Sequence, residues 1–316
     1  MGLYIRKLDK ITKEINMSIT KKLNCISFEF NKKVRSTLVR YSESKNISKK
    51  KSLIEKVVLS KEQEQEILSF YKQYYGKSIS FDWHRLYQSY TGRFNKDYFP
   101  EYIFSTQLEP LMNPYPIAEF LGDKNLIPIL FRGIESLHIP TTYISCVNGI
   151  LQNGDGDILN QESAIGLLNN IGKCVVKKTI ETNSGRDVRV CEFVDGKDKN
   201  TQRTILDIIS DFDENYVVQE FIVQHESLSC LCASAVNTFR VITYICNDNI
   251  NVCPVSLRLG RNGADKDNMH YGGISIGVKD DMTLKEKAYS EYGDAYTCHP
   301  DTHVLLSNRK IGGVTL

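Results

Sequence analysis

The amino-acid sequence predicts an α+β protein in which a mainly helical N-terminal region precedes a larger region of mixed strands and helices. Two observations carry this expectation. From Met1 to about Tyr90 the pattern is helical, with few glycines and no proline. After residue 122, short apolar or alternating runs that suit strands are interrupted by segments that suit helices.

Composition limits the class of protein. A chain of 316 residues with 41% hydrophobic and 25% charged residues is typical of globular proteins with a sizeable core. Its apolar stretches are too short to cross a bilayer, and no apolar segment follows the first basic residues. We therefore expect a cytoplasmic protein. The nine scattered cysteines lack zinc or redox spacing, and we expect reduced, structural thiols.

The charge is unevenly distributed. Residues 1–60 hold fifteen Lys or Arg and five Asp or Glu, a local charge of +10, so the remainder of this +2 chain carries −8. A solvated helix face is one interpretation, and contact with an anionic membrane surface is another, because Leu3, Ile5, Leu8, Ile11 and Ile15 recur at roughly helical spacing. No aromatic stripe accompanies the charge, so nucleic acid is not expected as a partner.

The elements follow in order. Ser60 with Gln63 predicts a capping box, opening a helix through Ile67 and Tyr71 that ends near Gly76. Four prolines between residues 92 and 122 predict an irregular connection. Asp123 to Glu135 suits a helix, as does Thr201 to Ile209. The runs that suit strands are Val175-Val176, Tyr216 to Ile222, Phe239 to Cys246 and Val252 to Leu259.

Four segments of this second region carry candidate chemistry. Lys177 ends a strand before the Thr182–Arg186 loop, where backbone N–H groups can face a phosphate; an ordinary Ser-Gly turn is the alternative. The strand from Tyr216 can offer backbone groups to an adenine edge. Arg240 lies among apolar strand residues, where an anionic ligand or a structural salt bridge would compensate its burial. Asp267-Asn268 precedes the paired glycines Gly272-Gly273, which allow close approach to a ligand.

Together, these segments resemble the ATP-grasp superfamily, especially the sugar-transfer-associated ATP-grasp family of bacterial polysaccharide gene clusters. The matching blocks are Asp123-Lys124 with His138-Ile139-Pro140-Thr141, Asn237-Thr238-Phe239-Arg240-Val241, Arg258-Leu259-Gly260, Asp267-Asn268 with Gly272-Gly273-Ile274, and His299-Pro300-Asp301-Thr302. The resemblance covers about residues 95–311. It does not explain the first ninety residues, for which the sequence pattern predicts a helical region over 1–95. It implies an ATP-grasp region over 96–316, with a linker and first helix to about 145, a nucleotide-binding subdomain over about 146–222 and a catalytic core from about 223.

The resemblance also implies roles for individual residues. Lys124 and Lys177 would contact nucleotide phosphates, and Ser184 and Gly185 would lie in the loop that closes over them. Arg240 and Asn268 would face the γ-phosphate and the acyl phosphate made from it. The adenine-binding linker would comprise Glu220, Phe221 and Ile222, with His225 or Glu226 near the ribose. Lys178 replaces the proline often found after the conserved lysine.

The implied activity is ATP-dependent joining of a carboxylate to an amine or similar nucleophile, through an acyl phosphate and with magnesium, in bacterial cell-surface polysaccharide assembly. Family members carry their magnesium ligands several dozen positions after the His-Pro-Asp-Thr block, whereas only Val304 to Leu316 follow here, without Asp or Glu. We therefore expect an incomplete fold and nominate no metal ligand. Three explanations stay open: an inactive remnant, a second polypeptide that supplies the missing half, or a nucleotide- or partner-binding module without catalysis. Asp265, Asp267, Asp280 and Asp281 could be recruited as ligands or could simply line a surface loop.

Overall fold

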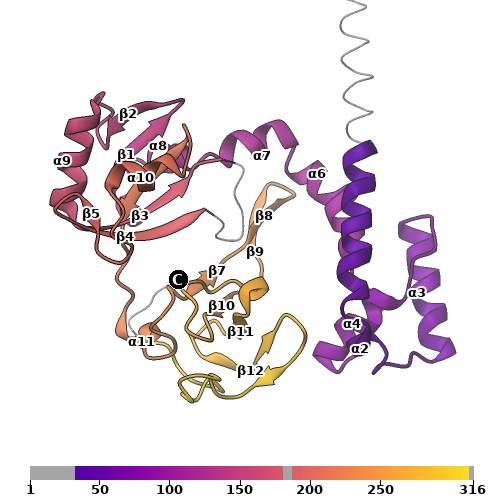
Figure 1. Cartoon of the computed structure of the whole chain (residues 1–316). Coiled ribbons are helices and arrows are strands. Elements are labelled where there is room, and N and C mark those ends of the chain that lie inside the picture. Colours follow the sequence, from indigo (N-terminus) through magenta and orange to yellow (C-terminus); the bar gives the residue numbers. More distant parts are fainter. Residues whose placement is uncertain (1–32, 181–186, 313–316) are drawn as a thin grey trace, which may run out of the picture. The chain divides into compact units, whose positions relative to one another are not determined.

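The computed structural model describes residues 33–180 and 187–312. The chain divides into two units, residues 1–115 and 116–316, and each is described by itself (Figure 1). The apolar stripe from Leu3 to Ile15 and the loop residues Ser184 and Gly185 lie outside the described residues.

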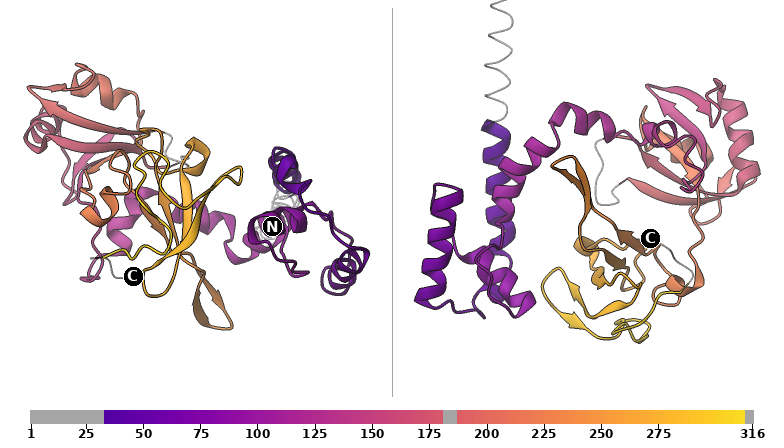
Figure 2. Two further views of the ribbon diagram at one scale, coloured as in Figure 1. Left: turned by 90° about the horizontal axis from the view of Figure 1, so that it is seen from below. Right: turned by 180° about the vertical axis from the view of Figure 1, so that it is seen from behind.

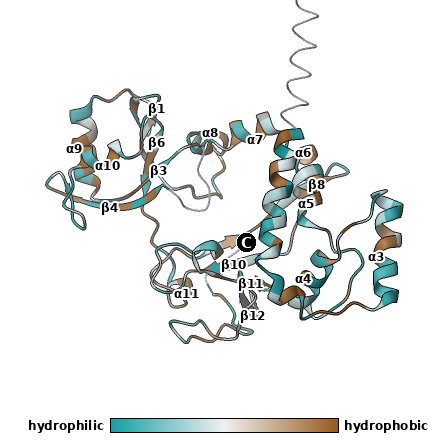
Figure 3. Cartoon of the chain, turned by 45° about the vertical axis from the view of Figure 1, so that its right-hand side comes forward, coloured by the Kyte–Doolittle hydropathy of each residue, from teal (hydrophilic) through white to brown (hydrophobic). Residues whose placement is uncertain are grey.

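The first unit is helical, as predicted. Ser60 caps α3 through a capping box in which its hydroxyl accepts from the Gln63 amide while the Gln63 side chain accepts from the Ser60 amide. Ile67 and Tyr71 are the buried residues of this helix, and Figure 3 shows its hydrophilic and hydrophobic residues. The helices of this unit span residues 33–48, α2 (Lys51–Ile54), α3 (Lys61–Tyr74), α4 (Asp82–Thr91), α5 (Glu101–Ile103), the π-helical η1 (Phe104–Leu108) and α6 (Glu109–Met112).

The proline-rich connection is more regular than the sequence predicts. Residues 101–112 are helical, and α7 (Tyr115–Leu121) follows. Pro100 is the N-cap residue of α5, where a missing amide costs no intrahelical hydrogen bond, so it begins the helix. Pro110 directly follows the π-helical η1, and the helical run continues through it. The expectation of an irregular segment was wrong here.

The second unit begins with a shorter helix than expected. Asp123 caps η2 (Lys124–Leu126), which runs into α8 (Ile127–Leu130), and the helix stops well before Glu135. Gly133 has a φ of 87°, a left-handed conformation that no continuing α-helix adopts.

A six-stranded antiparallel sheet, the first sheet, forms the core of residues 142–220. Its order is β2-β1-β6-β3-β4-β5. Figures 1 and 2 show α9 and α10 packed on it, and together they bury a cluster that includes Leu168, Phe193 and Ile208. The helix predicted from Thr201 begins only after Thr204, whose hydroxyl accepts from the Asp207 amide. The elements are β1 (Thr142–Val147), β2 (Ile150–Asn153), α9 (Gln161–Ile171), β3 (Lys173–Lys178), β4 (Val188–Val194), β5 (Lys197–Asp198), α10 (Ile205–Ser210) and β6 (Tyr216–Glu220).

A five-stranded antiparallel sheet, the second sheet, follows in the order β13-β12-β11-β10-β7. Its inner face is covered by irregular segments and short helical turns, which contribute Leu231, Leu306 and Ile311 to the core. The elements are α11 (Glu226–Ser229), β7 (Thr238–Arg240), β10 (Ser256–Leu259), η3 (Met269–Tyr271), β11 (Ile274–Val278), β12 (Leu284–Ser290) and β13 (Ala295–Tyr296).

Two predicted strands are each divided in two. The run Phe239 to Cys246 contains the end of β7 and all of β8 (Thr243–Cys246). The run Val252 to Leu259 begins at the last residue of β9 (Asn249–Val252) and ends with β10. The register shifts by one residue between Arg240 opposite Ser256 and Thr243 opposite Val252, beside Pro254, which has no amide to donate. Asn247 and Asp248, both with positive φ, close the β8–β9 ribbon as a two-residue turn.

The β8–β9 ribbon exposes a set of apolar side chains. The most exposed are Ile250 (75%) and Ile245 (69%). Among the described residues, no helix is both long enough and apolar enough to cross a bilayer. The α+β class is confirmed, since the chain combines helices with sheets whose strands all pair antiparallel.

Candidate functional site

Two lysines from distant segments lie together beside the first sheet. Lys177 is half-buried in β3, and both the amide and the Nζ of Lys124 donate to the Thr179 carbonyl two residues further on, at 3.1 and 3.2 Å. Burial lowers the pKa of Lys177, and the neighbouring charge of Lys124 lowers it further. The pair therefore forms a concentrated positive charge that an anion would stabilise.

Two polar atoms near these lysines have no hydrogen-bond partner. They are the Thr179 hydroxyl and the Asn125 carboxamide oxygen, both buried. Buried polar groups in proteins are nearly always paired, so these atoms fit a site that a polar ligand completes. Lys178, the next residue of the strand, instead binds Asp213 at 2.6 Å.

The linker after β6 has three consecutive backbone amides that can bind a ligand. The amides of Phe221, Ile222 and Val223 donate to no main-chain carbonyl within residues 33–180 and 187–312. Phe221 is held by the Lys173 ammonium, 3.7 Å from its ring centroid. A planar base with an N–H donor and a ring-nitrogen acceptor can pair with such a segment.

Three residues expected near the base and ribose have structural partners. The Glu220 carboxylate accepts from the Thr141 amide at 3.0 Å, which together with His138 lowers its pKa, so its side chain fixes the start of the linker. His225 caps α11 through Nδ1, which accepts from the Ser227 amide. Glu226 opens that helix and is exposed. Their contact with a nucleotide remains a prediction.

The second sheet contributes two arginines on one face. Thr238 pairs with Arg258, and Arg240 pairs with Ser256, so the two arginines are diagonal neighbours on β7 and β10. Burial first, and the charge of Arg240 second, lower the pKa of Arg258, while Asp267 raises it. Asp267 also accepts a short hydrogen bond from the Thr238 hydroxyl. Asp267 thus offsets part of the charge of Arg258, while the neighbouring Arg240 adds to the positive charge on this face.

This arrangement corrects one step of the sequence argument. Arg240 ends an edge strand and is exposed, so no burial cost has to be compensated there. Arg258 is the partly buried arginine. Its position beside Arg240 was missed, because it depends on a strand register that is not visible in the sequence.

Asn268 is oriented by its own turn. Its carboxamide oxygen accepts from the His270 amide at 2.8 Å, which leaves its NH₂ group to donate outward. A side chain at Gly273 would place a Cβ 2.4 Å from the Asp267 carbonyl oxygen, so only glycine lets the chain pass this turn.

A buried polar hub fixes this part of the sheet. The Gly260 amide donates to Asn237 Oδ1 at 3.1 Å, and the Gly260 carbonyl lies 2.8 Å from His299 Nε2. His299 Nδ1 accepts from the Asp301 and Thr302 amides, so Nε2 carries the proton that Gly260 accepts. Asn237 and His299 are therefore structural, and they hold the end of β10 just past Arg258.

Gln224 completes the hub. Its amide nitrogen donates to the carbonyls of Cys232 and Ala235, and its oxygen accepts from both nitrogens of Asn237. No sequence pattern identified it, because its partners are backbone atoms and one distant side chain.

Within residues 33–180 and 187–312, no group of three or more His, Cys, Asp or Glu side chains converges. Asp267 accepts a hydrogen bond from Thr238, and its charge acts on Arg258.

A model of the sugar-transfer-associated ATP-grasp family matches residues 103–315. The chain belongs to this family. Membership supports an ATP-grasp, ligase-like function for the chain, and members of the superfamily generally use ATP with magnesium. No curated protein and no solved structure matches this chain.

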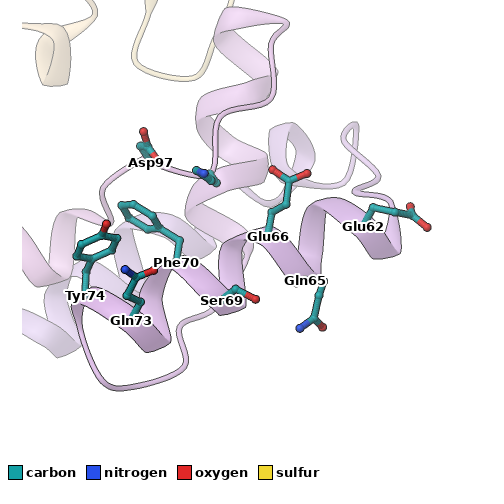
Figure 4. A pocket seen from close by; sticks show the side chains of 9 residues that line it. Glu62, Gln65, Glu66, Ser69, Phe70, Gln73, Tyr74 and Asp97 are labelled. Carbon is teal, nitrogen blue, oxygen red and sulfur yellow. The ribbon is translucent and has the colours of Figure 1, made fainter.

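The helical unit carries a separate hollow of about 690 Å³ along α3. Figure 4 shows that Glu62 and Gln65 point away from Phe70 and Tyr74 rather than towards a common centre. The open lining has acidic, amide and aromatic groups and does not resemble the cationic surfaces of the two sheets.

Proposed function

We propose that this chain is an ATP-dependent ligase that activates a carboxylate as an acyl phosphate and transfers the acyl group to an amine or similar nucleophile. The observation that supports it most directly is the lysine pair, because two partly buried cations that lie close together suit a polyphosphate. The linker backbone would bind the adenine, and His225 or Glu226 would lie near the ribose.

The reaction follows from the charges. A carboxylate oxygen attacks the γ-phosphorus, and ADP leaves; the amine then attacks the acyl carbon, phosphate leaves, the nitrogen loses a proton, and an amide remains. Arg240 and Arg258 would stabilise negative charge on the transferred phosphoryl group, and Asn268 would donate its NH₂ group to an oxygen of that group. Lys124 and Lys177 would hold the phosphates in line.

Calorimetric titration of the full chain with ATP, with and without magnesium, tests the proposal. Lys177→Ala should weaken ATP binding at least about tenfold, since it removes a charge-assisted contact. Lys178→Ala is the matched control. It also removes a lysine from β3, but this lysine forms an ion pair with Asp213. Equal binding by wild type and Lys177→Ala would contradict the nucleotide site. Binding without turnover of any carboxylate would favour a nucleotide-binding module.

The cellular setting is a further proposal. The family's association with sugar transfer supports a role in bacterial cell-surface polysaccharide assembly in the cytoplasm, on sugar-linked substrates. Deleting the gene in its host and analysing the surface polysaccharide tests this. An unchanged polysaccharide, with every amide-linked substituent retained, would refute it.

We also propose peripheral membrane association through the basic residues 1–60. Co-sedimentation of the full chain with phosphatidylserine vesicles, lost at high salt, is the expected result. Equal sedimentation with phosphatidylcholine vesicles would rule out the electrostatic mechanism.

A further inference from the structure

A second hollow in the helical unit, of about 320 Å³, lies outside the region that the family model matches. The helix over residues 33–48, the segment Ser78–Trp83 and Tyr102 of α5 line it. Its volume is in the range that encloses a small molecule. The residues that carry chemistry there are Arg40, Ser44, Ser78, Asp82, Trp83 and Tyr102.

One cation faces this hollow without an acid partner. The Arg40 guanidinium lies 5.3 Å from the centroid of the Tyr102 ring, and in the described part of the chain it forms no ion pair. A planar guanidinium positioned by an aromatic ring is suited to binding a carboxylate or a phosphate.

The aromatic wall also offers a donor. Trp83 is 8% exposed and packs with Leu53 and Leu86, yet its indole N–H donates to no acceptor among residues 33–180 and 187–312. The N–H is not among the fully buried polar atoms that lack a partner, so it keeps contact with solvent and can donate to a ligand oxygen.

The remaining lining consists of acceptors. Ser44 and Ser48 donate their hydroxyl protons to carbonyls of their own helix, and Ser80 donates to Asp82. Each of these hydroxyl oxygens can therefore still accept a hydrogen bond, and so can the Asp82 carboxylate. A ligand that donates several hydroxyl groups would satisfy them.

We propose that this hollow binds a monosaccharide-sized polyol that carries one anionic group, a carboxylate or a phosphate. Arg40 binds the anionic group, Trp83 donates to a ring or hydroxyl oxygen, and the serine oxygens with Asp82 accept the ligand hydroxyls. The site does not depend on the lysine pair or on ATP, so its failure and failure of the ligase proposal are separate results.

The chain's only tryptophan reports on this site directly, because Trp83 is that residue. We would titrate the full chain with glucuronate, glucose 1-phosphate and glucose, following intrinsic tryptophan fluorescence. The charged sugars should give saturable changes, and glucose should bind at least about tenfold more weakly, the value of one charge-assisted contact. The tighter of glucuronate and glucose 1-phosphate identifies the anion as carboxylate or phosphate.

Arg40→Ala should remove the preference for charged sugars, while Lys45→Ala, an exposed cation on the same helix that contacts Tyr41 instead, should not. Trp83→Phe keeps an aromatic ring and loses the N–H, and ligand-observed NMR should show weaker binding. Circular dichroism confirms that each variant folds. No saturable response from either charged sugar, or wild-type binding by a folded Arg40→Ala, would overturn the proposal.

Discussion

The two sheets of residues 116–316 are both antiparallel, yet they are covered in different ways. The first sheet packs against α9 and α10, whose backbone groups pair within the helices. The second is covered by irregular segments, whose backbone groups take partners from Gln224, Asn237 and His299. Apolar contacts therefore dominate the first core, and the second also requires specific buried hydrogen bonds.

The largest expected effect tests the apolar side of this comparison. Phe193→Ala should lower the free energy of unfolding by about 3–5 kcal/mol, because Phe193 is 2% exposed and its loss leaves a cavity in the first core. Chemical denaturation followed by circular dichroism measures it. A loss below about 1 kcal/mol would mean that the helices collapse onto the vacated space.

Asn237→Ala tests the polar side. It should cost about 2–3 kcal/mol, since the Gly260 amide and the oxygen of Gln224 lose a buried partner together. Asn249→Ala, an exposed asparagine of the β8–β9 ribbon, is the control and should change stability by less than about 0.5 kcal/mol. Equal effects of the two substitutions would remove the distinction between the sheets.

We expect the lysine pair to lower the free energy of unfolding of the protein without ATP. Lys177→Met should stabilise the protein without ATP by about 1 kcal/mol while abolishing ATP binding, because it removes a half-buried charge beside Lys124. The Lys177 pKa is lower in the folded than in the unfolded chain, so the unfolded state binds more protons between those two values. The stability difference between variant and wild type should therefore shrink as the pH rises through that window, which thermal unfolding at several alkaline pH values would show. A difference that does not change with pH would contradict the charge argument.

The smallest expected effect concerns the helical cover of the first sheet. Thr204→Ala should cost about 1 kcal/mol, the usual loss when a capping box is removed. Thr201→Ala removes a neighbouring hydroxyl that binds Asp198 and not α10, and so separates capping from loop effects. Hydrogen exchange should speed up in the α10 amides only for Thr204→Ala.

Local patterns in the sequence predicted the features that depend on near neighbours. The capping box of Ser60, the strands around Val175 and Tyr216 and the α+β class are confirmed. The order of the matching blocks identified the family. Lys124 lies close enough to Lys177 for its charge to lower the Lys177 pKa, and contact of the two lysines with nucleotide phosphates stays a prediction. Roles for Glu220, His225 and Glu226 in binding a nucleotide stay predictions.

What the sequence did not show depends on register and on distant partners. The break between Arg240 and Thr243 arises from a shift against β10 and β9, and it leaves Arg240 exposed where burial was expected. Gln224 and His299 are hubs only because Asn237 and Gly260 meet them across long stretches of chain. Pro100 begins a helix, and Pro110 lies within one, where a proline count suggested a break.

We expect the β8–β9 ribbon to affect self-association of the protein more than its folding stability. A two-stranded ribbon has no second layer, so Ile245 and Ile250 remain in water whether or not the rest of the chain is folded. Their substitution by threonine should leave the melting temperature nearly unchanged, yet raise the concentration at which light scattering first detects self-association. Two apolar side chains at the tip of one hairpin can thus favour self-association without contributing to the cores that hold the fold together.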